Sequence, residues 1–75
     1  MDTPPILTAK NFGTLIQSAR KAQGLTQDDL AGLTGTGRRF ISDLENGKET
    51  IQLGKALHVL SSLGIALSIR QNWKK

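Results

Sequence analysis

Glycines divide this sequence into short segments, and this division limits the possible folds more than any other feature. The segments carry apolar side chains at helical spacing and are separated by Gly24, the pair Gly35 and Gly37, Gly47 and Gly64. Glycine readily adopts the left-handed conformation that commonly ends a helix. Two glycines within residues 34–37 would cost a continuous helix roughly 2 kcal/mol relative to alanine. The pattern therefore predicts four short helices joined by tight turns.

The predicted helices cover residues 9–23, 27–33, 38–46 and 51–63. We expect Thr8 to cap the first and Thr50 the fourth, while Thr26 and Asp29 form a capping-box pattern at the start of the second. Their spacing directs one apolar face of each helix inward. The predicted inward side chains are Phe12, Leu15, Ile16, Ala19, Leu30, Ala31, Leu33, Phe40, Ile41, Leu44, Ile51, Leu53, Ala56, Leu57, Leu60 and Leu63.

Over residues 65–70, apolar residues no longer recur at helical spacing but at every second position. Ile65, Leu67 and Ile69 alternate there with smaller or polar side chains. This predicts one C-terminal β-strand in an otherwise all-α protein. A solitary strand leaves its backbone groups unpaired within its own chain. We therefore expect a homodimer in which two copies of the strand pair antiparallel across a two-fold axis. The alternatives are a frayed tail and a strand that folds onto its own helices.

A chain of 75 residues holds one domain and buries only about 60% of its unfolded surface, so its stability alone is expected to be marginal. Because it has no Cys and one His, disulfides and a structural metal do not supply the missing stability. We therefore expect oligomerisation to supply the missing stability. We expect an extended segment at 1–8, the domain at 9–70 and a basic tail at 71–75, in which Trp73 has no assigned role.

Several functional classes are disfavoured by composition. One histidine, His58, and scattered acids provide no catalytic or metal-binding constellation, so we expect neither an enzyme nor a cofactor. The first ten residues resemble neither a secretory signal nor a membrane span, and we expect a cytoplasmic protein with no membrane contact. A net charge of +4 is compatible with a polyanionic partner but also with an ordinary soluble surface.

Residues 23–48 resemble the helix-turn-helix of the Xre or Cro-type family. The pattern LTQxxLA is matched by residues 25–31, the turn glycine by Gly35, and the ending xxLExGK by residues 42–48. The resemblance implies a lambda-repressor-like domain of four to five helices in which the helix beginning at Arg38 enters the DNA major groove. This sequence departs from the family's frequent pattern at two positions. Thr36 stands where the family commonly has an apolar residue, and Gly37 stands where it commonly has Ser or Thr.

Positions at the start of the predicted recognition helix are candidates for DNA contacts. Arginine binds guanine O6 and N7 in bidentate fashion, so we expect Arg38 or Arg39 to read a base and the other to read a base or bind phosphate. The resemblance places Gln27 beside the DNA backbone. Asp43 would bind cytosine or orient Arg39. The complete candidate set is Gln27, Thr36, Gly37, Arg38, Arg39, Ser42, Asp43, Asn46 and Lys48.

The same resemblance implies an ion pair between Arg20 and Glu45 that braces the first helix against the end of the recognition helix. A partly exposed pair contributes little stability, so we expect its value to lie in orientation. The expected dimer residues are Ile65, Leu67 and Ile69.

Residues 34–69 also look like the HipB-type antitoxins, in which four helices precede one strand. This resemblance implies a dimer that binds an inverted repeat in its own promoter, with half-sites roughly 34 Å apart, and a HipA-like serine/threonine kinase toxin as partner. The alternatives are a simple phage-type or chromosomal repressor without a toxin, and an interaction adaptor that has lost DNA binding.

Overall fold

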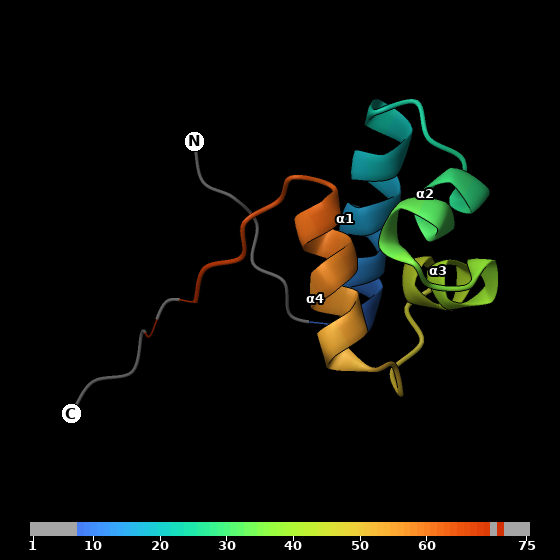
Figure 1. Ribbon diagram of the computed structural model, residues 1–75. Coiled ribbons are helices and arrows are strands. Elements are labelled where there is room, and N and C mark those ends of the chain that lie inside the picture. Colours follow the sequence, from blue (N-terminus) through green and yellow to red (C-terminus); the bar gives the residue numbers. More distant parts are fainter. Residues whose placement is uncertain (1–7, 70, 72–75) are drawn as a thin grey trace.

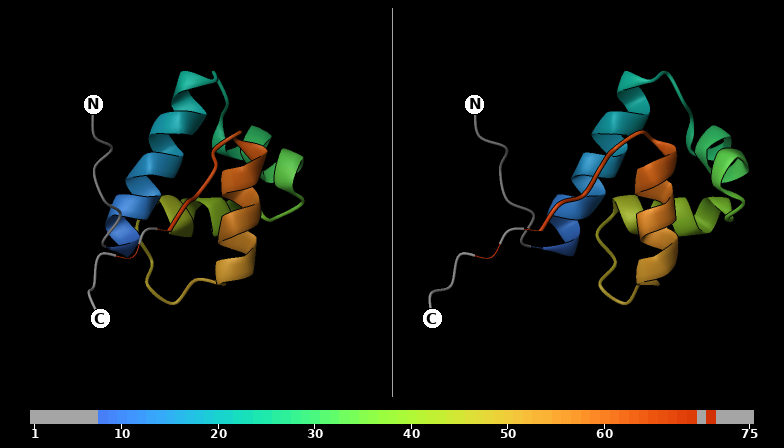
Figure 2. Two further views of the ribbon diagram at one scale, coloured as in Figure 1. Left: turned by 90° about the vertical axis from the view of Figure 1, so that its left-hand side faces the viewer. Right: turned by 60° about the vertical axis from the view of Figure 1, so that its left-hand side comes forward.

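The computed structural model describes residues 8–69 and 71 as four helices. These are α1 (Ala9–Ala22), α2 (Gln27–Thr34), α3 (Arg38–Glu45) and α4 (Leu53–Ser62). Helix α3 packs against α1 and α2, and α2 also packs against α4 (Figures 1 and 2). None of these helices is long and apolar enough to cross a membrane. The four predicted helices are confirmed.

Local capping chemistry explains where the first two helices begin. The Thr8 hydroxyl accepts a hydrogen bond from the Asn11 amide at 3.0 Å, as predicted for an N-cap. At α2, the Asp29 amide donates to the Thr26 hydroxyl at 3.0 Å and the Thr26 amide donates to the Asp29 carboxylate at 2.8 Å, which completes the capping box. The predicted stops are also found, with positive φ at Gly24, Gly35, Gly47 and Gly64.

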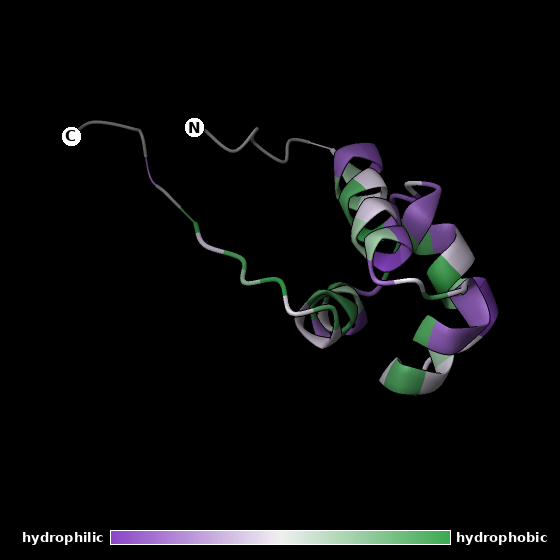
Figure 3. Ribbon diagram, turned by 90° about the horizontal axis from the view of Figure 1, so that it is seen from above, coloured by the Kyte–Doolittle hydropathy of each residue, from purple (hydrophilic) through white to green (hydrophobic). Residues whose placement is uncertain are grey.

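Side chains from all four helices form the core. The buried apolar residues are Ile16, Leu30, Ala31, Ile41, Leu44, Ala56, Val59, Leu60 and Leu63. Figure 3 shows hydrophobic and hydrophilic residues alternating around the helices, whereas the segment that follows α4 is largely hydrophobic. The core is therefore built from one apolar face of each helix, as the periodicity predicts.

Three predicted core positions on α2 and α4, Leu33, Leu53 and Leu57, are wrong. Leu33 is 62% exposed, and Thr34 is buried instead. At about 100° per residue, position 34 lies between Leu30 and Ala31 around the helix axis, whereas position 33 lies to one side. On α4, Leu57 is exposed and Val59 is buried, because Val59 lies closer than Leu57 to the buried Ala56 and Leu63 around the helix axis.

The start of α4 also differs from the prediction. The helix begins at Leu53 with Gln52 as N-cap, two residues later than expected, and Thr50 precedes the cap. Leu53, in the first turn, is exposed. Ile51 still packs against the core, but from the loop that precedes the helix.

Residues 65–69 form no β-strand in the described chain. A strand needs a neighbour for its backbone hydrogen bonds, and the single chain supplies none here. Ile65 packs against the core, whereas Leu67 and Ile69 are exposed. Figure 1 shows the segment leaving the end of α4 and running away from the helices. Arg70 and Trp73 lie outside the described residues, as do 1–7 of the predicted N-terminal segment and most of the predicted tail.

Candidate nucleic-acid interface

The turn between α2 and α3 fixes which residues begin α3. Gly35 ends α2 with φ of 72°, and the Thr36 amide donates to the Ala31 carbonyl at 3.2 Å. Gly37 is the N-cap of α3 and makes no side-chain cap bond, as expected for glycine, while its carbonyl accepts from the amides of the next turn. Arg38 is therefore the first residue of α3. Both Arg38 and Arg39 are exposed there.

A buried ion pair joins α1 to the end of α3. Arg20 Nε lies 2.6 Å from Glu45 Oε2, and Arg20 Nη2 donates to Glu45 Oε1 at 3.0 Å. Arg20 Nη1 also donates to the Leu25 carbonyl at 2.7 Å, in the loop before α2. The two side chains are 8% and 1% exposed, so the pair is buried and not partly exposed as expected. It links three parts of the domain in a bidentate geometry that fixes their orientation.

Glu45 also accepts a hydrogen bond from the start of α2. Gln27 Nε2 donates to Glu45 Oε1 at 3.1 Å, so the Gln27 side chain joins the buried pair to the surface. Burial alone would raise the pKa of the Glu45 carboxyl, but the hydrogen bonds from Arg20 and Gln27 and the charge of Arg20 outweigh it and hold the pKa below its usual value. Glu45 therefore remains ionised, and the start of α2 stays fixed relative to α3.

Four of the predicted DNA-contacting residues line one surface depression. Gln27 comes from the start of α2, and Arg38, Arg39 and Ser42 come from the first half of α3. We call these four residues the arginine patch. Because Gln27 is held by Glu45, the patch has a fixed edge on α2 and two long cationic side chains on α3.

The remaining predicted residues lie toward the end of α3 and in the turn before it. Lys48 Nζ is 3.4 Å from Asp43 Oδ2, so the acid that was expected to orient Arg39 pairs with Lys48 instead. Asn46 Nδ2 donates to Ser42 Oγ at 3.5 Å. Thr36 shares a hydroxyl hydrogen bond of 2.9 Å with buried Thr34. Asp43 and Lys48 line a second depression, with Phe40 and the loop before α4.

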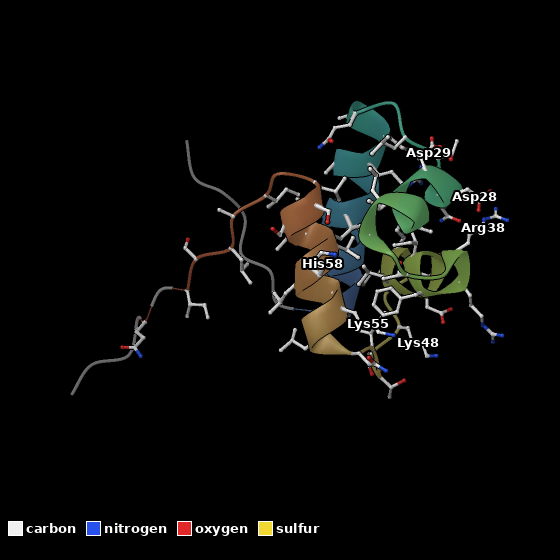
Figure 4. The ribbon with its side chains drawn as sticks, viewed as in Figure 1. Asp28, Asp29, Arg38, Lys48, Lys55 and His58 are labelled. Carbon is white, nitrogen blue, oxygen red and sulfur yellow. The ribbon has the colours of Figure 1, made fainter. Side chains whose placement is uncertain are left out.

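One residue beside the patch, Asp28, does not stand out from the sequence pattern. Asp28 Oδ1 lies 3.5 Å from Arg38 Nε, and both side chains are largely exposed (Figure 4). Asp28 lies in the first turn of α2, where an acidic side chain also interacts favourably with the helix dipole. The spacing of residues along one helix does not show which residues of two different helices are in contact. The pair could have been predicted only from the known arrangement of the two helices in a helix-turn-helix.

Within residues 8–69 and 71, no group of three or more His, Asp or Glu side chains is arranged to hold a metal ion. His58 is exposed on α4.

Comparison with known proteins places the chain in a family. The helix-turn-helix family matches residues 16–69. Over 64 residues the chain is 52% identical to an uncharacterized HTH-type transcriptional regulator of Sinorhizobium fredii, covering 85% of this chain and 84% of that protein. Chains of the HipB–O4 20mer complex and of the HipA–HipB–O2–O3 complex share the fold, each with a TM-score of 0.84 at 22% identity over 95% of this chain and 100% of theirs. The chain belongs to the Xre-type helix-turn-helix family of DNA-binding transcriptional regulators.

Proposed function

We propose that this protein is a transcriptional repressor that binds an inverted-repeat operator as a homodimer and reads it with α3. The observation that carries the proposal is the arginine patch, which presents Arg38 and Arg39 at the exposed start of α3 beside Gln27. The N-terminal end of a recognition helix is the part that approaches base edges in the major groove. Arginine there matches the two acceptors of guanine.

Backbone contacts surround this reading surface in the proposed complex. The exposed loop after α3 carries Asn46 and Lys48, which would bind phosphate, and Thr36 and Gly37 bring the turn close to the DNA backbone. Such contacts position the protein without reading sequence. The net charge of +4 supports attraction to DNA over a longer range.

Loss of either arginine of the patch is expected to weaken operator binding. Replacing Arg38 or Arg39 with alanine should cost about 1 to 3 kcal/mol for the side chain that reads a base. Both side chains are exposed, so the thermal unfolding midpoint should not change. Fluorescence anisotropy with a duplex from the protein's own promoter measures the affinity. Wild-type affinity in both variants would contradict the assignment of α3.

We propose that residues 65–70 form the dimer strand that the single chain leaves without a partner. Leu67 and Ile69 are exposed, the latter at 88%, and Leu53 and Leu57 add exposed apolar surface on α4. Antiparallel pairing with a second copy would satisfy the backbone of this segment and cover Ile65, Leu67 and Ile69. The Ile65 contact with the core fixes where the strand would begin.

Charges on one side of this strand should therefore break the dimer. Replacing Leu67 and Ile69 together with lysine should raise the dimer dissociation constant by about tenfold or more, because two apolar side chains per chain lose a buried environment. The matched control replaces Ala66 and Ser68 with lysine, which adds the same charge on the alternate side. Analytical ultracentrifugation measures the dimer dissociation constant of each double variant. Equal dissociation constants for the two double variants would show that the strand is not the interface.

The narrower function that we propose is that of a HipB-like antitoxin, with a HipA-like kinase as its partner. Support comes from the similarity of residues 34–69 to HipB-type proteins and from the shared fold with a chain of the HipA–HipB–O2–O3 complex. Co-expression with the neighbouring gene, followed by affinity purification and mobility shift on the upstream promoter, tests this directly. A co-purifying kinase-like protein supports the antitoxin; a promoter shift without any partner supports a simple repressor.

A further inference from the structure

The ion pair between Asp28 and Arg38 lies at the reading end of α3 and contributes little to holding the fold together. Arg38 Nε and Asp28 Oδ1 are 3.5 Å apart, and the side chains are 67% and 74% exposed. Exposed pairs of this kind contribute little stability, because water screens the charges. Figure 4 shows the two side chains meeting beyond the start of α2 and α3, away from the core. Any consequence of the pair is therefore expected at the DNA surface.

The contact with Nε determines which nitrogens of Arg38 are left for DNA. A guanidinium has five N–H donors, and Nε carries one of them. With the carboxylate on the Nε side, the terminal nitrogens remain available for guanine O6 and N7. The carboxylate also repels a phosphate that approaches the same guanidinium. Arg39, in contrast, has no ion pair or hydrogen bond with another side chain in the described part of the chain.

We propose that Asp28 is a specificity-determining residue: it positions Arg38 to read a guanine, opposes phosphate binding by Arg38, and leaves Arg39 to bind the DNA backbone. This inference rests on the proposed DNA-binding function and assigns separate roles to two arginines that the sequence does not distinguish. Asp28 acts through Arg38 and makes no base contact itself, so it is a positioning residue.

Removing the Asp28 charge should lower discrimination between DNA sequences. For Asp28→Asn, the ratio of operator affinity to scrambled-duplex affinity is expected to fall by about two- to fivefold, the size of an exposed ion-pair effect. The control is Glu49→Gln, which makes the same change in net charge at an exposed loop residue outside the patch. A general loss of α2 stability would weaken binding to both duplexes alike, so it would not change the ratio.

Double variants connect the effect to Arg38. In the Arg38→Ala background, Asp28→Asn should no longer change the ratio, whereas in the Arg39→Ala background it should lower the ratio as in the wild type. Asp28→Glu, which keeps a carboxylate, should restore most of the discrimination. All affinities are measured by fluorescence anisotropy of the full-length chain with an upstream-promoter duplex and its scrambled counterpart at one salt concentration, since DNA affinity varies steeply with salt.

Two results separate failure of this inference from failure of the proposed function. If the wild type discriminates between the duplexes but Asp28→Asn behaves like Glu49→Gln, or its effect persists without Arg38, only the role of Asp28 is overturned. If the wild type binds both duplexes equally, the proposed function is wrong and the role of Asp28 is overturned with it.

Discussion

Replacing Gly13 with alanine is expected to destabilise the protein by about 3 kcal/mol, although alanine favours helices more than glycine does. Gly13 lies on α1 where the last carbonyls of α3 approach it. A Cβ at this position would lie 2.7 Å from the Glu45 carbonyl oxygen and 2.9 Å from its carbonyl carbon, and would also meet the Leu44 carbonyl oxygen. Backbone atoms cannot rotate aside as a side chain does, so α1 and α3 would have to separate.

Gly32 provides the matched control for this substitution. It lies within α2, is exposed, and an added Cβ there would meet no atom within 4 Å. Gly32→Ala should therefore stabilise the protein by up to about 1 kcal/mol. Urea unfolding followed by circular dichroism measures both variants. If Gly13→Ala were also stabilising, the close approach of α1 and α3 would be wrong.

Loss of the Glu45 carboxylate is expected to have a similarly large effect. Glu45→Ala should destabilise the protein by about 3 to 5 kcal/mol, because it leaves Arg20 buried without its counter-charge. Arg20 would keep its hydrogen bond to the Leu25 carbonyl, and Gln27 would lose its acceptor. Replacing both members of the pair, as Arg20→Met with Glu45→Leu, should cost less than Glu45→Ala alone, because no uncompensated charge stays buried.

The pH dependence of unfolding provides an independent measure of the same pair. Because the folded protein holds the pKa of Glu45 below its usual value, the stabilisation is fully present above the ordinary glutamate pKa of about 4.3 and is lost as the pH falls through the folded pKa. The free energy of unfolding of the wild type should therefore approach that of Glu45→Gln in acid. A difference between the two that stays constant from neutral to acidic pH would contradict an ionised, buried Glu45.

The sequence predicts helix ends in this protein better than it predicts which side chains are buried. Thr8, Thr26 and Gly35 act through hydrogen bonds or dihedral angles within a few residues, so a local pattern is enough to identify them. Leu33 and Thr34 show why burial is harder to predict from the sequence. Periodicity gives a face of a helix but not its exact centre, and hydrophobicity favoured Leu33 where the angular position favoured Thr34.

Features that depend on contacts between distant segments were the ones that the sequence did not reveal. The approach of Gly13 to the end of α3 and the pairing of Asp28 with Arg38 both require the relative placement of two helices. By contrast, the sequence itself predicts a strand at 65–70, but such a strand would need a second chain for its backbone hydrogen bonds. Arg20 and Glu45 were matched through family resemblance, but their burial follows only from the packing of α1 against α3.

The central proposal is that the arginine patch on α2 and α3 makes this protein a sequence-specific DNA binder. The most direct test is a fluorescence anisotropy titration of the wild-type protein with an upstream-promoter duplex and with a scrambled duplex, repeated over a series of salt concentrations. We predict that the promoter duplex binds at least about a thousandfold tighter, with a salt slope that indicates several neutralised phosphates. Equal affinity for both duplexes with a shallow salt slope would contradict the proposal and favour a protein-interaction adaptor.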